Sequence, residues 1–311
     1  MTSTRTFLVD LEPHAAALLD RHLASAKEWF PHEYVPYHRG RDFEPGHQWT
    51  PDESDLGGAD IPEAVRSALY VNLLTEDNLP YYFRHIERTF GADGAFGTWV
   101  RRWTAEEGRH AIVIRDYLMA TRAIDPVALE RGRMVQVAGG ESPEPDSPLS
   151  ALVYVSLQEM ATRIAHRNTG RLLGDEAGFR VMARVAADEN LHHLFYRDLT
   201  SAALDLWPSE VVIAIEEVVR TFAMPGTGIP DFQRHSALIA SAGIYDATIH
   251  HEQILIPVVL NHWKVAQLIN LTPAAEQARD ALLRRIERIG RLARSLASRR
   301  DASEKQTVGH V

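Results

Sequence analysis

Six residues of types that bind metal ions recur in this sequence with a regular spacing. They form two copies of one pattern, in which a lone glutamate is followed roughly thirty residues later by the string Glu-x-x-His. On a helix, residues three apart lie on one face, so the carboxylate and the imidazole of such a string can reach one ion side by side. The six predicted metal ligands are Glu76, Glu107, His110, Glu159, Glu189 and His192.

Four carboxylates and two imidazoles define the kind of metal site. Carboxylate oxygens can bridge two ions, each ion can receive one imidazole nitrogen, and coordination positions stay open for oxygen. The sequence contains no cysteine, which excludes thiolate ligands and iron–sulfur clusters. The same ligand set is described for ferritin-like proteins with a dinuclear carboxylate centre. We therefore predict two iron ions, held as a di-iron centre that activates oxygen.

A single Glu-x-x-His string carries little information. Glu44 and His47 have the same spacing in a segment rich in Pro and Gly, where no helix is expected. Each predicted ligand, taken alone, also has a plainer interpretation as a buried side chain paired with an arginine such as Arg109 or Arg163. The repeat favours the metal site, because several separate acids in apolar helix faces would each be costly to bury without a shared cation.

Helical periodicity dominates the chain, and no segment shows the alternation typical of a strand. We predict an all-α fold, with a ferritin-like four-helix bundle at its core and additional packed helices. One domain is expected over 1–300 and a disordered tail over 301–311. The ligand-bearing helices are expected at 62–90, 94–122, 148–173 and 176–206. Further helices are expected at 12–30, 126–137, 208–223, 230–241, 250–271 and 273–298.

Pro80 lies four residues after the predicted ligand Glu76. Within a helix, a proline ring clashes with the carbonyl group four residues back and cannot donate a backbone hydrogen bond. We therefore predict that the first ligand-bearing helix kinks or opens at Glu76.

Charge and hydropathy exclude several classes of protein. The net charge of −9 argues against a general nucleic-acid binder. No apolar run approaches the roughly 18 residues that a membrane span requires, and the N-terminus lacks the pattern of a signal or transit peptide. We expect a cytoplasmic protein. The last predicted helix is cationic, and its arginines form either a solvated face or a docking patch for an acidic partner. They are Arg279, Arg284, Arg285, Arg288, Arg291, Arg294 and Arg299.

At these residues the sequence resembles the soluble acyl-[acyl-carrier-protein] desaturases of the stearoyl type. The strings that carry the resemblance are TEDNLP at 75–80, WTAEEGRH at 103–110, SLQEMAT at 156–162, HRNTG at 166–170, ADENLH at 187–192 and NHWK at 261–264. The resemblance implies a homodimeric, mostly helical enzyme that acts on a fatty acyl chain carried by acyl carrier protein. Such an enzyme uses O2 and two electrons from reduced ferredoxin, and it leaves a cis double bond.

The resemblance also assigns roles to single residues. One iron and its bridge correspond to Glu76, Glu107 and His110, and the other iron corresponds to Glu159, Glu189 and His192. Thr162 matches a threonine that lies beside the oxygen site and assists proton delivery; the alternative is a hydroxyl bonded to the backbone of its own helix. Asp188 matches an acid that relays electrons towards His110.

The chain departs from the family pattern at several positions. Tyr37 or His38 stands where the family has the tryptophan of its electron route, and Ala111 replaces a glycine. Positions near the acyl tunnel of the family correspond to His85, Arg88, Thr89, Ala151 and Leu152. If the polar ones face the tunnel, its depth or its cargo differs.

Four alternatives to a desaturase fit the same ligands. The first is a related di-iron oxidase or hydroxylase of acyl chains, and the second is a ferritin-like iron-binding protein that stores or detoxifies iron. The third is a radical-generating ribonucleotide reductase subunit, which requires a tyrosine near the metals. Candidates on the ligand-bearing helices are Tyr82, Tyr117, Tyr154 and Tyr196. The fourth is a non-catalytic protein that binds acyl carrier protein.

Overall fold

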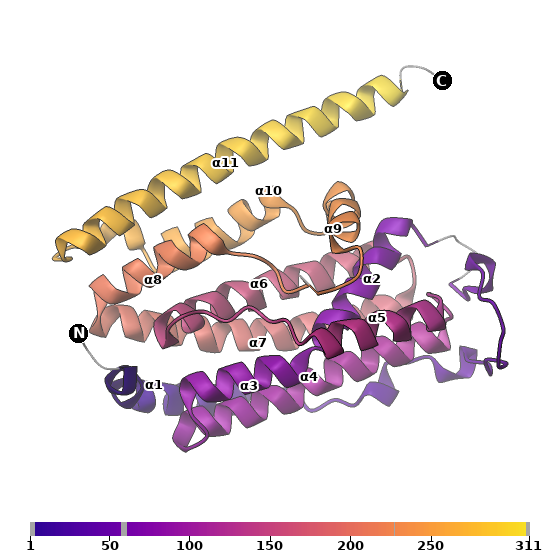
Figure 1. The fold of residues 1–311 in the computed structure, drawn as a ribbon, viewed down its shortest axis with the longest axis horizontal. Helices are drawn as coiled ribbons and strands as arrows, with labels where there is room; N and C mark the ends of the chain where they lie inside the picture. Colours follow the sequence, from indigo (N-terminus) through magenta and orange to yellow (C-terminus); the bar gives the residue numbers. More distant parts are fainter. Residues whose placement is uncertain (1–3, 57–60, 227, 309–311) are drawn as a thin grey trace.

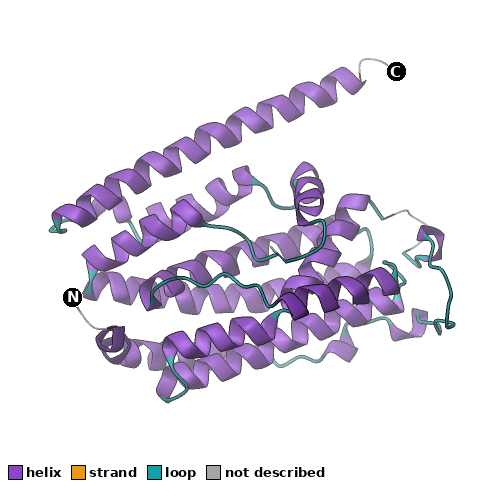
Figure 2. Cartoon of the chain, viewed as in Figure 1, coloured by secondary structure: helices purple, strands orange, loops and turns teal. Residues whose placement is uncertain are grey.

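The computed structural model describes residues 4–56, 61–226 and 228–308. Within these ranges the chain forms helices joined by loops, and no strand occurs (Figure 2). The predicted all-α class is therefore confirmed. No helix among the described residues is both long enough and apolar enough to cross a membrane.

Four helices form a closed bundle at the centre of the molecule. They are α2 (Glu63–Glu76), α4 (Gly94–Ala120), α6 (Pro148–Leu172) and α7 (Glu176–Leu206). α2 packs against α4, α4 against α7, α7 against α6 and α6 against α2, so each helix has two neighbours in a ring (Figure 1). This arrangement confirms the predicted ferritin-like bundle, and all six predicted ligands lie on these four helices.

The starts of α6 and α7 follow from their first residues. Ser147 precedes α6, and its side chain accepts a hydrogen bond from the backbone N–H of Ser150 at 3.0 Å. Asp175 precedes α7 and accepts from the N–H of Gly178 at 2.8 Å. Such caps satisfy backbone donors that have no partner inside the helix. The observed bounds agree with the predicted ones to within a residue.

The first ligand-bearing helix is interrupted where Pro80 predicted an interruption. α2 ends at Glu76, and α3 (Leu79–Phe90) begins after a two-residue break with Pro80 in its first turn. Proline is well tolerated there because the first-turn N–H groups have no helical acceptor. Glu76 therefore lies on the last turn of α2 instead of in the middle of one long helix.

Additional helices surround the bundle. These are α1 (Thr4–Ser25), α5 (Pro126–Gly139), α8 (Pro208–Thr221), α9 (Phe232–Ser241), α10 (Ala247–His250), a π-helical segment (His251–His262) and α11 (Pro273–Val308). The prediction for α1 was wrong at both ends. The helix begins at Thr4, eight residues before the predicted start at Glu12, runs through Pro13 and ends five residues before Phe30.

Over the segment predicted as a disordered tail, α11 continues as a helix to Val308, and residues 309–311 lie outside the described part of the chain. The segment 299–308 contains neither Pro nor Gly, so nothing in it stops helical hydrogen bonding.

α11 is cationic, as the sequence predicted, and it runs along the outer side of the molecule over α8 (Figure 1). Leu282 and Ile286 are buried on its inner face. Arg284, Arg288 and Arg294 are exposed on its outer face. The helix is therefore amphipathic.

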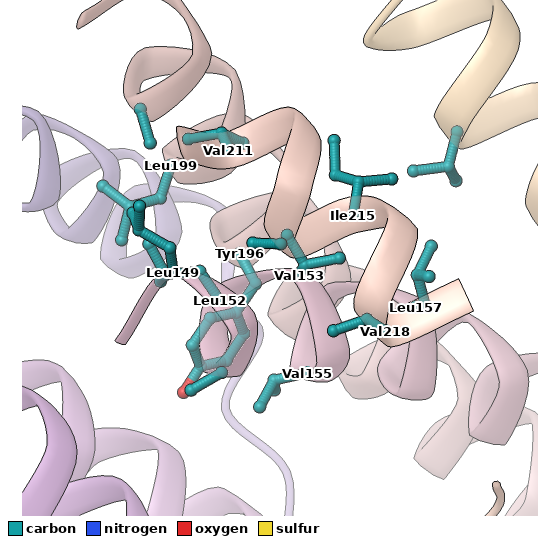
Figure 3. Packing of buried hydrophobic residues seen from close by; sticks show 14 of the residues in the cluster. Leu149, Leu152, Val153, Val155, Leu157, Tyr196, Leu199, Val211, Ile215 and Val218 are labelled. Atoms are coloured by element: carbon teal, nitrogen blue, oxygen red, sulfur yellow. The ribbon is translucent and has the colours of Figure 1, made fainter. Parts of the chain in front are cut away.

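Two hydrophobic clusters fill the interior and leave the predicted ligands between them. The larger cluster joins α6, the second half of α7 and α8, as Figure 3 shows for Leu152, Tyr196 and Ile215. The smaller cluster joins α2, the second half of α4 and the first half of α7. α4 and α7 pass through both clusters, and their Glu-x-x-His strings lie at the boundary. Rigid packing on both sides therefore fixes the positions of the ligands.

Candidate metal centre

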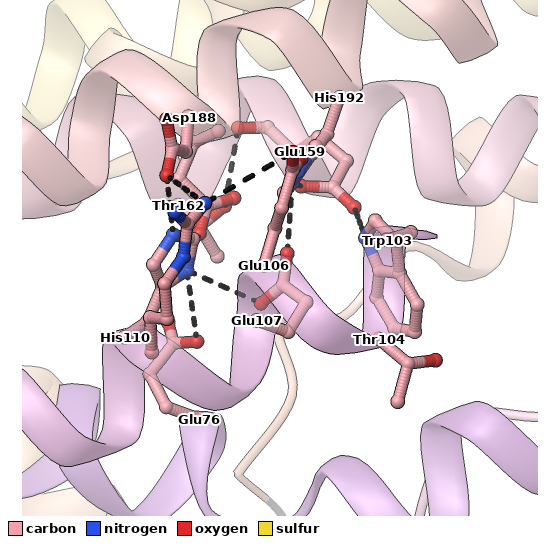
Figure 4. A network of polar contacts seen from close by, with 12 residues as sticks. Glu76, Trp103, Thr104, Glu106, Glu107, His110, Glu159, Thr162, Asp188 and His192 are labelled. Carbon is pink, nitrogen blue, oxygen red and sulfur yellow. Dashed lines mark hydrogen bonds and ion pairs between the residues drawn. The ribbon is translucent and has the colours of Figure 1, made fainter. Parts of the chain in front are cut away.

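The structure brings all six predicted ligands together in the interior. Each of them is at most 7% exposed. The ligand atoms form two groups, each confined to a region in which the atoms lie within 4.8 Å of one another. One group is Glu76, Glu107, His110 and Glu189, and the other is Glu107, Glu159, Glu189 and His192. Glu107 (Figure 4) and Glu189 belong to both groups, so each of them could serve either of two ions.

The donor set fits a pair of cations. Glu107 Oε1, Glu159 Oε2, His110 Nδ1 and His192 Nδ1 are buried and make no hydrogen bond with the described residues, although they approach one another, as His192 Nδ1 and Glu107 Oε1 do at 2.8 Å. Buried polar atoms without a hydrogen bond are rare in folded proteins and require an explanation. Here they converge on one place, where a cation would satisfy them together. Two divalent cations would also balance the four negative charges of the glutamates.

The pKa shifts of Glu159 and His192 also favour a site that holds cations. Burial raises the pKa of Glu159 well above its usual value, and the neighbouring charge of Glu189 adds to the effect. Burial alone would lower the pKa of His192, but hydrogen bonds and charges of the surrounding carboxylates outweigh it and raise this pKa well above its usual value. Protons and metal cations therefore compete for the same positions, as expected of a metal site.

Polar side chains beyond the ligands hold the two outer glutamates. His166 Nε2 donates to Glu76 Oε1 at 2.9 Å, and Trp103 Nε1 donates to Glu159 Oε1 at 3.0 Å. Both donors are buried. Each contact occupies one carboxylate oxygen and leaves the other for a metal ion, so these residues fix the orientation of the ligands.

Thr162 lies beside the shared carboxylate of Glu189. Its Oγ1 donates to Glu189 Oε2 at 2.7 Å and also lies 3.1 Å from the carbonyl oxygen of Glu159 in its own helix. The backbone contact expected from the alternative interpretation is therefore present, and the contact with Glu189 is the shorter of the two.

Asp188 lies directly behind the ligand His110. Its Oδ2 accepts a hydrogen bond from Trp29 Nε1 at 2.7 Å and lies 3.5 Å from His110 Nε2. Arg184 binds the other oxygen, and the guanidinium of Arg109 lies 3.3 Å from Oδ2. Burial would raise the pKa of Asp188, but the interaction with His110 and the nearby arginines outweighs it and lowers this pKa to about 2.

A cavity opens onto the candidate ligands. Its lining includes Glu76, Glu107, Glu159, Glu189, Thr162 and Trp103. The remainder is mainly apolar and aromatic, and includes Tyr82, Ile86, Ala151, Tyr154, Val155, Pro143 and Pro145. A second, mainly apolar cavity shares Thr75, Thr162 and Pro225 with the first and extends towards α9. Apolar space therefore lies directly beside the candidate metal ligands.

Comparison with known proteins identifies the family. The sequence profile described as fatty acid desaturase matches residues 4–310. The chain belongs to the fatty acid desaturase family. The resemblance stated from the sequence strings is thereby confirmed.

Individual relatives agree with the family profile. The chain is 42% identical to a protein of Mycobacterium tuberculosis named as the acyl-[acyl-carrier-protein] desaturase DesA1, over 88% of this chain and 82% of that protein. It is 30% identical to a chloroplastic acyl-[acyl-carrier-protein] desaturase 6 of rice, over 83% and 70%. An X-ray structure of the M. tuberculosis protein DesA2 superposes with a TM-score of 0.69 at 28% identity, covering 88% of this chain and 99% of that one.

The structure places a tryptophan beside Asp188, and this residue is neither Tyr37 nor His38. Trp29 Nε1 donates to Asp188 Oδ2 at 2.7 Å. Tyr37 donates to Asp116 at 2.5 Å on the surface. Trp29 lies in the segment between α1 and α2, which has only short helical turns and so has no periodicity by which its residues could be aligned from the sequence.

The tunnel positions that were matched to the desaturases divide into two groups. His85 and Ala151 line the cavity. Arg88, Thr89 and Leu152 do not: Arg88 is exposed, Thr89 donates to the carbonyl of His85 at 2.8 Å, and Leu152 is packed in the larger hydrophobic cluster. Of the three polar residues among these positions, only His85 lines the cavity.

Sequence reasoning missed three residues of the site. Trp29, Glu106 and His22 were not singled out, although all three are buried around the histidine ligands. For Glu106 a signal existed. An acid directly precedes the glutamate of each Glu-x-x-His string, as Glu106 before Glu107 and as Asp188 before Glu189. For His22 and Trp29 the sequence offers no comparable signal, because both lie far from the motifs along the chain.

Proposed function

We propose that this chain is a di-iron acyl-[acyl-carrier-protein] desaturase that introduces a cis double bond into a fatty acyl chain. The observation that carries the proposal is the combination of two ligand groups with a mainly apolar cavity at their side. The names of the relatives support acyl carrier protein as the carrier of the acyl chain. The ligands, four hard carboxylates and two imidazoles, suit iron.

The overall reaction has a simple balance. Two hydrogen atoms leave adjacent carbons of the acyl chain, and two electrons from a donor and two protons complete the reduction of one O2 to two waters. Bound iron supplies the oxygen activation. The residues of the chain hold the metal, orient the acyl chain in the cavity and keep bulk water away from the reacting carbons.

Two residues outside the ligand set are assigned further roles in this proposal. Thr162 is placed to hold a proton at Glu189, since its hydroxyl reaches that carboxylate at 2.7 Å. Asp188 is assigned to the path of electrons from a ferredoxin-type donor, because it connects Trp29 to His110. Following the family resemblance, we also propose that the protein works as a homodimer.

Product analysis tests this proposal. The purified protein is loaded with iron and incubated in air with acyl-ACP of several chain lengths, ferredoxin and ferredoxin reductase. We expect a product lighter by two hydrogens, with a cis double bond at a single position. An acyl profile that stays unchanged at every chain length, with iron bound, contradicts the proposal. A product that has gained an oxygen atom contradicts it in favour of the acyl hydroxylase alternative.

A further inference from the structure

The acids that precede the two Glu-x-x-His strings cross over to the opposite helix. Asp188 on α7 lies behind His110 of α4, and Glu106 on α4 lies behind His192 of α7. The two contacts are therefore equivalent: in each half of the site, the acid before one Glu-x-x-His string contacts the histidine of the other string. Asp188 already has a place in the proposed function, whereas Glu106 and the residue behind it have none.

Glu106 fixes the orientation of the His192 ring. Its Oε2 lies 2.9 Å from His192 Nε2, and its Oε1 binds Arg102 at 2.5 Å. A carboxylate can only accept, so His192 Nε2 carries the proton and Nδ1 is left with its lone pair towards the metal ligands. Burial would raise the pKa of Glu106, but hydrogen bonds from His192 and His22 outweigh it and hold this pKa below its usual value.

His22 completes the arrangement from outside the bundle. It lies in the last turn of α1, is 4% exposed, and its Nε2 lies 3.0 Å from the same Oε2 of Glu106. Trp99 packs against its ring edge to face, with the ring centroids 4.9 Å apart. Two buried imidazoles therefore donate to one carboxylate oxygen, and the second of them belongs to a helix that carries no predicted metal ligand.

The N-terminal segment thus supports both halves of the site. His22 stands behind Glu106 and His192, and Trp29, in the loop that follows α1, stands behind Asp188 and His110. The two contacts differ in chemistry, since His22 donates from an imidazole to Glu106 and Trp29 donates from an indole to Asp188. Each of these pairs contacts only one of the two histidine ligands.

We propose that Glu106 and His22 are positioning residues for His192, so that the metal ion held by Glu159 and His192 depends on α1. The inference rests on the proposed metal centre, but it does not depend on which reaction that centre performs. Hydrogen-bond partners of ligating histidines typically change metal affinity by about 10- to 100-fold when removed. Because His22 and Glu106 contact one histidine ligand only, the loss should fall on one ion of the pair.

The test is an anaerobic Fe(II) titration of metal-free protein, followed by near-infrared circular dichroism, which distinguishes the two ions by their ligand fields. The variants are Glu106→Gln, Glu106→Ala and His22→Ala. His14→Gln is the matched control, because His14 is exposed on the same helix. We expect one ion to bind about 10- to 100-fold more weakly in Glu106→Ala and His22→Ala, with a smaller loss in Glu106→Gln, which keeps an acceptor oxygen. Asp188→Asn should weaken the other ion, and His14→Gln neither.

Two outcomes overturn the proposal. One is wild-type affinity for both ions in His22→Ala and Glu106→Ala. The other is equal weakening of both ions, which shows a general structural role of α1. His22→Ala keeps the test decisive if a Glu106 variant fails to fold. Iron binding is measured without substrate, so the result is separate from the proposed function: a wild-type protein that binds two irons but never desaturates acyl-ACP refutes the function and leaves this inference standing.

Discussion

His192 Nδ1 on α7 lies 2.8 Å from Glu107 Oε1 on α4. The reverse contact also exists, since His110 Nδ1 on α4 lies 3.2 Å from Glu189 Oε1 on α7. Each Glu-x-x-His string therefore presents its histidine to the glutamate of the other string. This crossed arrangement makes Glu107 and Glu189 common to both ligand groups, and it explains why the two strings must occur as a pair.

Removing a shared ligand should affect both ions, whereas removing an outer ligand should affect one. We expect Glu107→Ala to lose most of its iron and all measurable turnover. Glu159→Ala should retain about one ion per chain, because Glu159 belongs to one group only. The measurement is iron per chain after anaerobic loading and desalting. Two firmly bound irons in Glu107→Ala would be incompatible with a bridging role.

Removal of metal should destabilise the fold. Four buried carboxylates in close proximity repel one another, and bound cations remove that repulsion. Ligand binding to the folded state stabilises it by about 2.7 kcal/mol when the free ligand is 100-fold above its Kd. We expect a clearly higher Tm for the iron-loaded protein than for protein treated with a chelator, measured by circular dichroism. Equal Tm values would show that the acids are neutralised without a metal.

Trp29 should matter for turnover and not for iron content. Trp29→Phe removes the indole N–H that binds Asp188 at 2.7 Å but keeps an aromatic ring in the buried position. We expect unchanged iron stoichiometry and roughly 10- to 100-fold slower turnover with ferredoxin. Loss of a hydrogen-bond partner in the shell around the metal ligands typically has an effect of this size. Trp49→Phe is a matched control, since it also loses an indole hydrogen bond, to the carbonyl of Arg122. Equal turnover in both variants argues against the assigned electron path.

Ala151 should limit the length of the acyl chain. It is 1% exposed to solvent and lines the cavity away from the metal ligands. Ala151→Leu fills part of that space, so we expect the preferred acyl-ACP to become shorter while iron content stays the same. Competition between acyl-ACPs of different length, with products separated by mass, measures the preference. An unchanged preference in a folded, iron-loaded variant would show that the acyl chain does not occupy this cavity.

His250 should contribute to acid sensitivity. The Tyr245 hydroxyl lies 2.8 Å from His250 Nδ1, and the ring stacks on Phe222. Burial, together with the charge of His251, lowers the pKa of His250 from 6.5 to about 4. The folded state therefore favours the neutral ring, so its contribution is present above pH 6.5 and is lost as pH falls towards about 4.

The corresponding variant is His250→Gln, which cannot take up a proton in this range but keeps an acceptor for Tyr245. Between pH 6.5 and pH 4, the free energy of unfolding of the wild type should fall by up to about 3 kcal/mol more than that of the variant. Urea unfolding of metal-free protein at several pH values measures the difference. His14→Gln should follow the wild type, and parallel profiles for wild type and His250→Gln would contradict the prediction.

Periodic features of the sequence predicted most of the fold and singled out six candidate ligands, which the structure brings together. The long helices show a buried face by their spacing, and Pro80 marked the break after Glu76 because its effect on a helix is local. Contacts that join distant segments could not be predicted in this way. Trp29 and His22 approach the candidate ligands through the packing of α1 on α4 and α7.

The central claim is that six residues hold two iron ions, and iron analysis combined with Mössbauer spectroscopy tests it most directly. The protein is loaded anaerobically with ⁵⁷Fe, desalted and measured before and after exposure to O2. We expect two irons per chain in nitrogen and oxygen coordination, magnetically coupled after oxidation, and loss of the coupled signal in Glu107→Ala. Fewer than one iron per chain, or two irons that persist unchanged in Glu107→Ala, would contradict the claim.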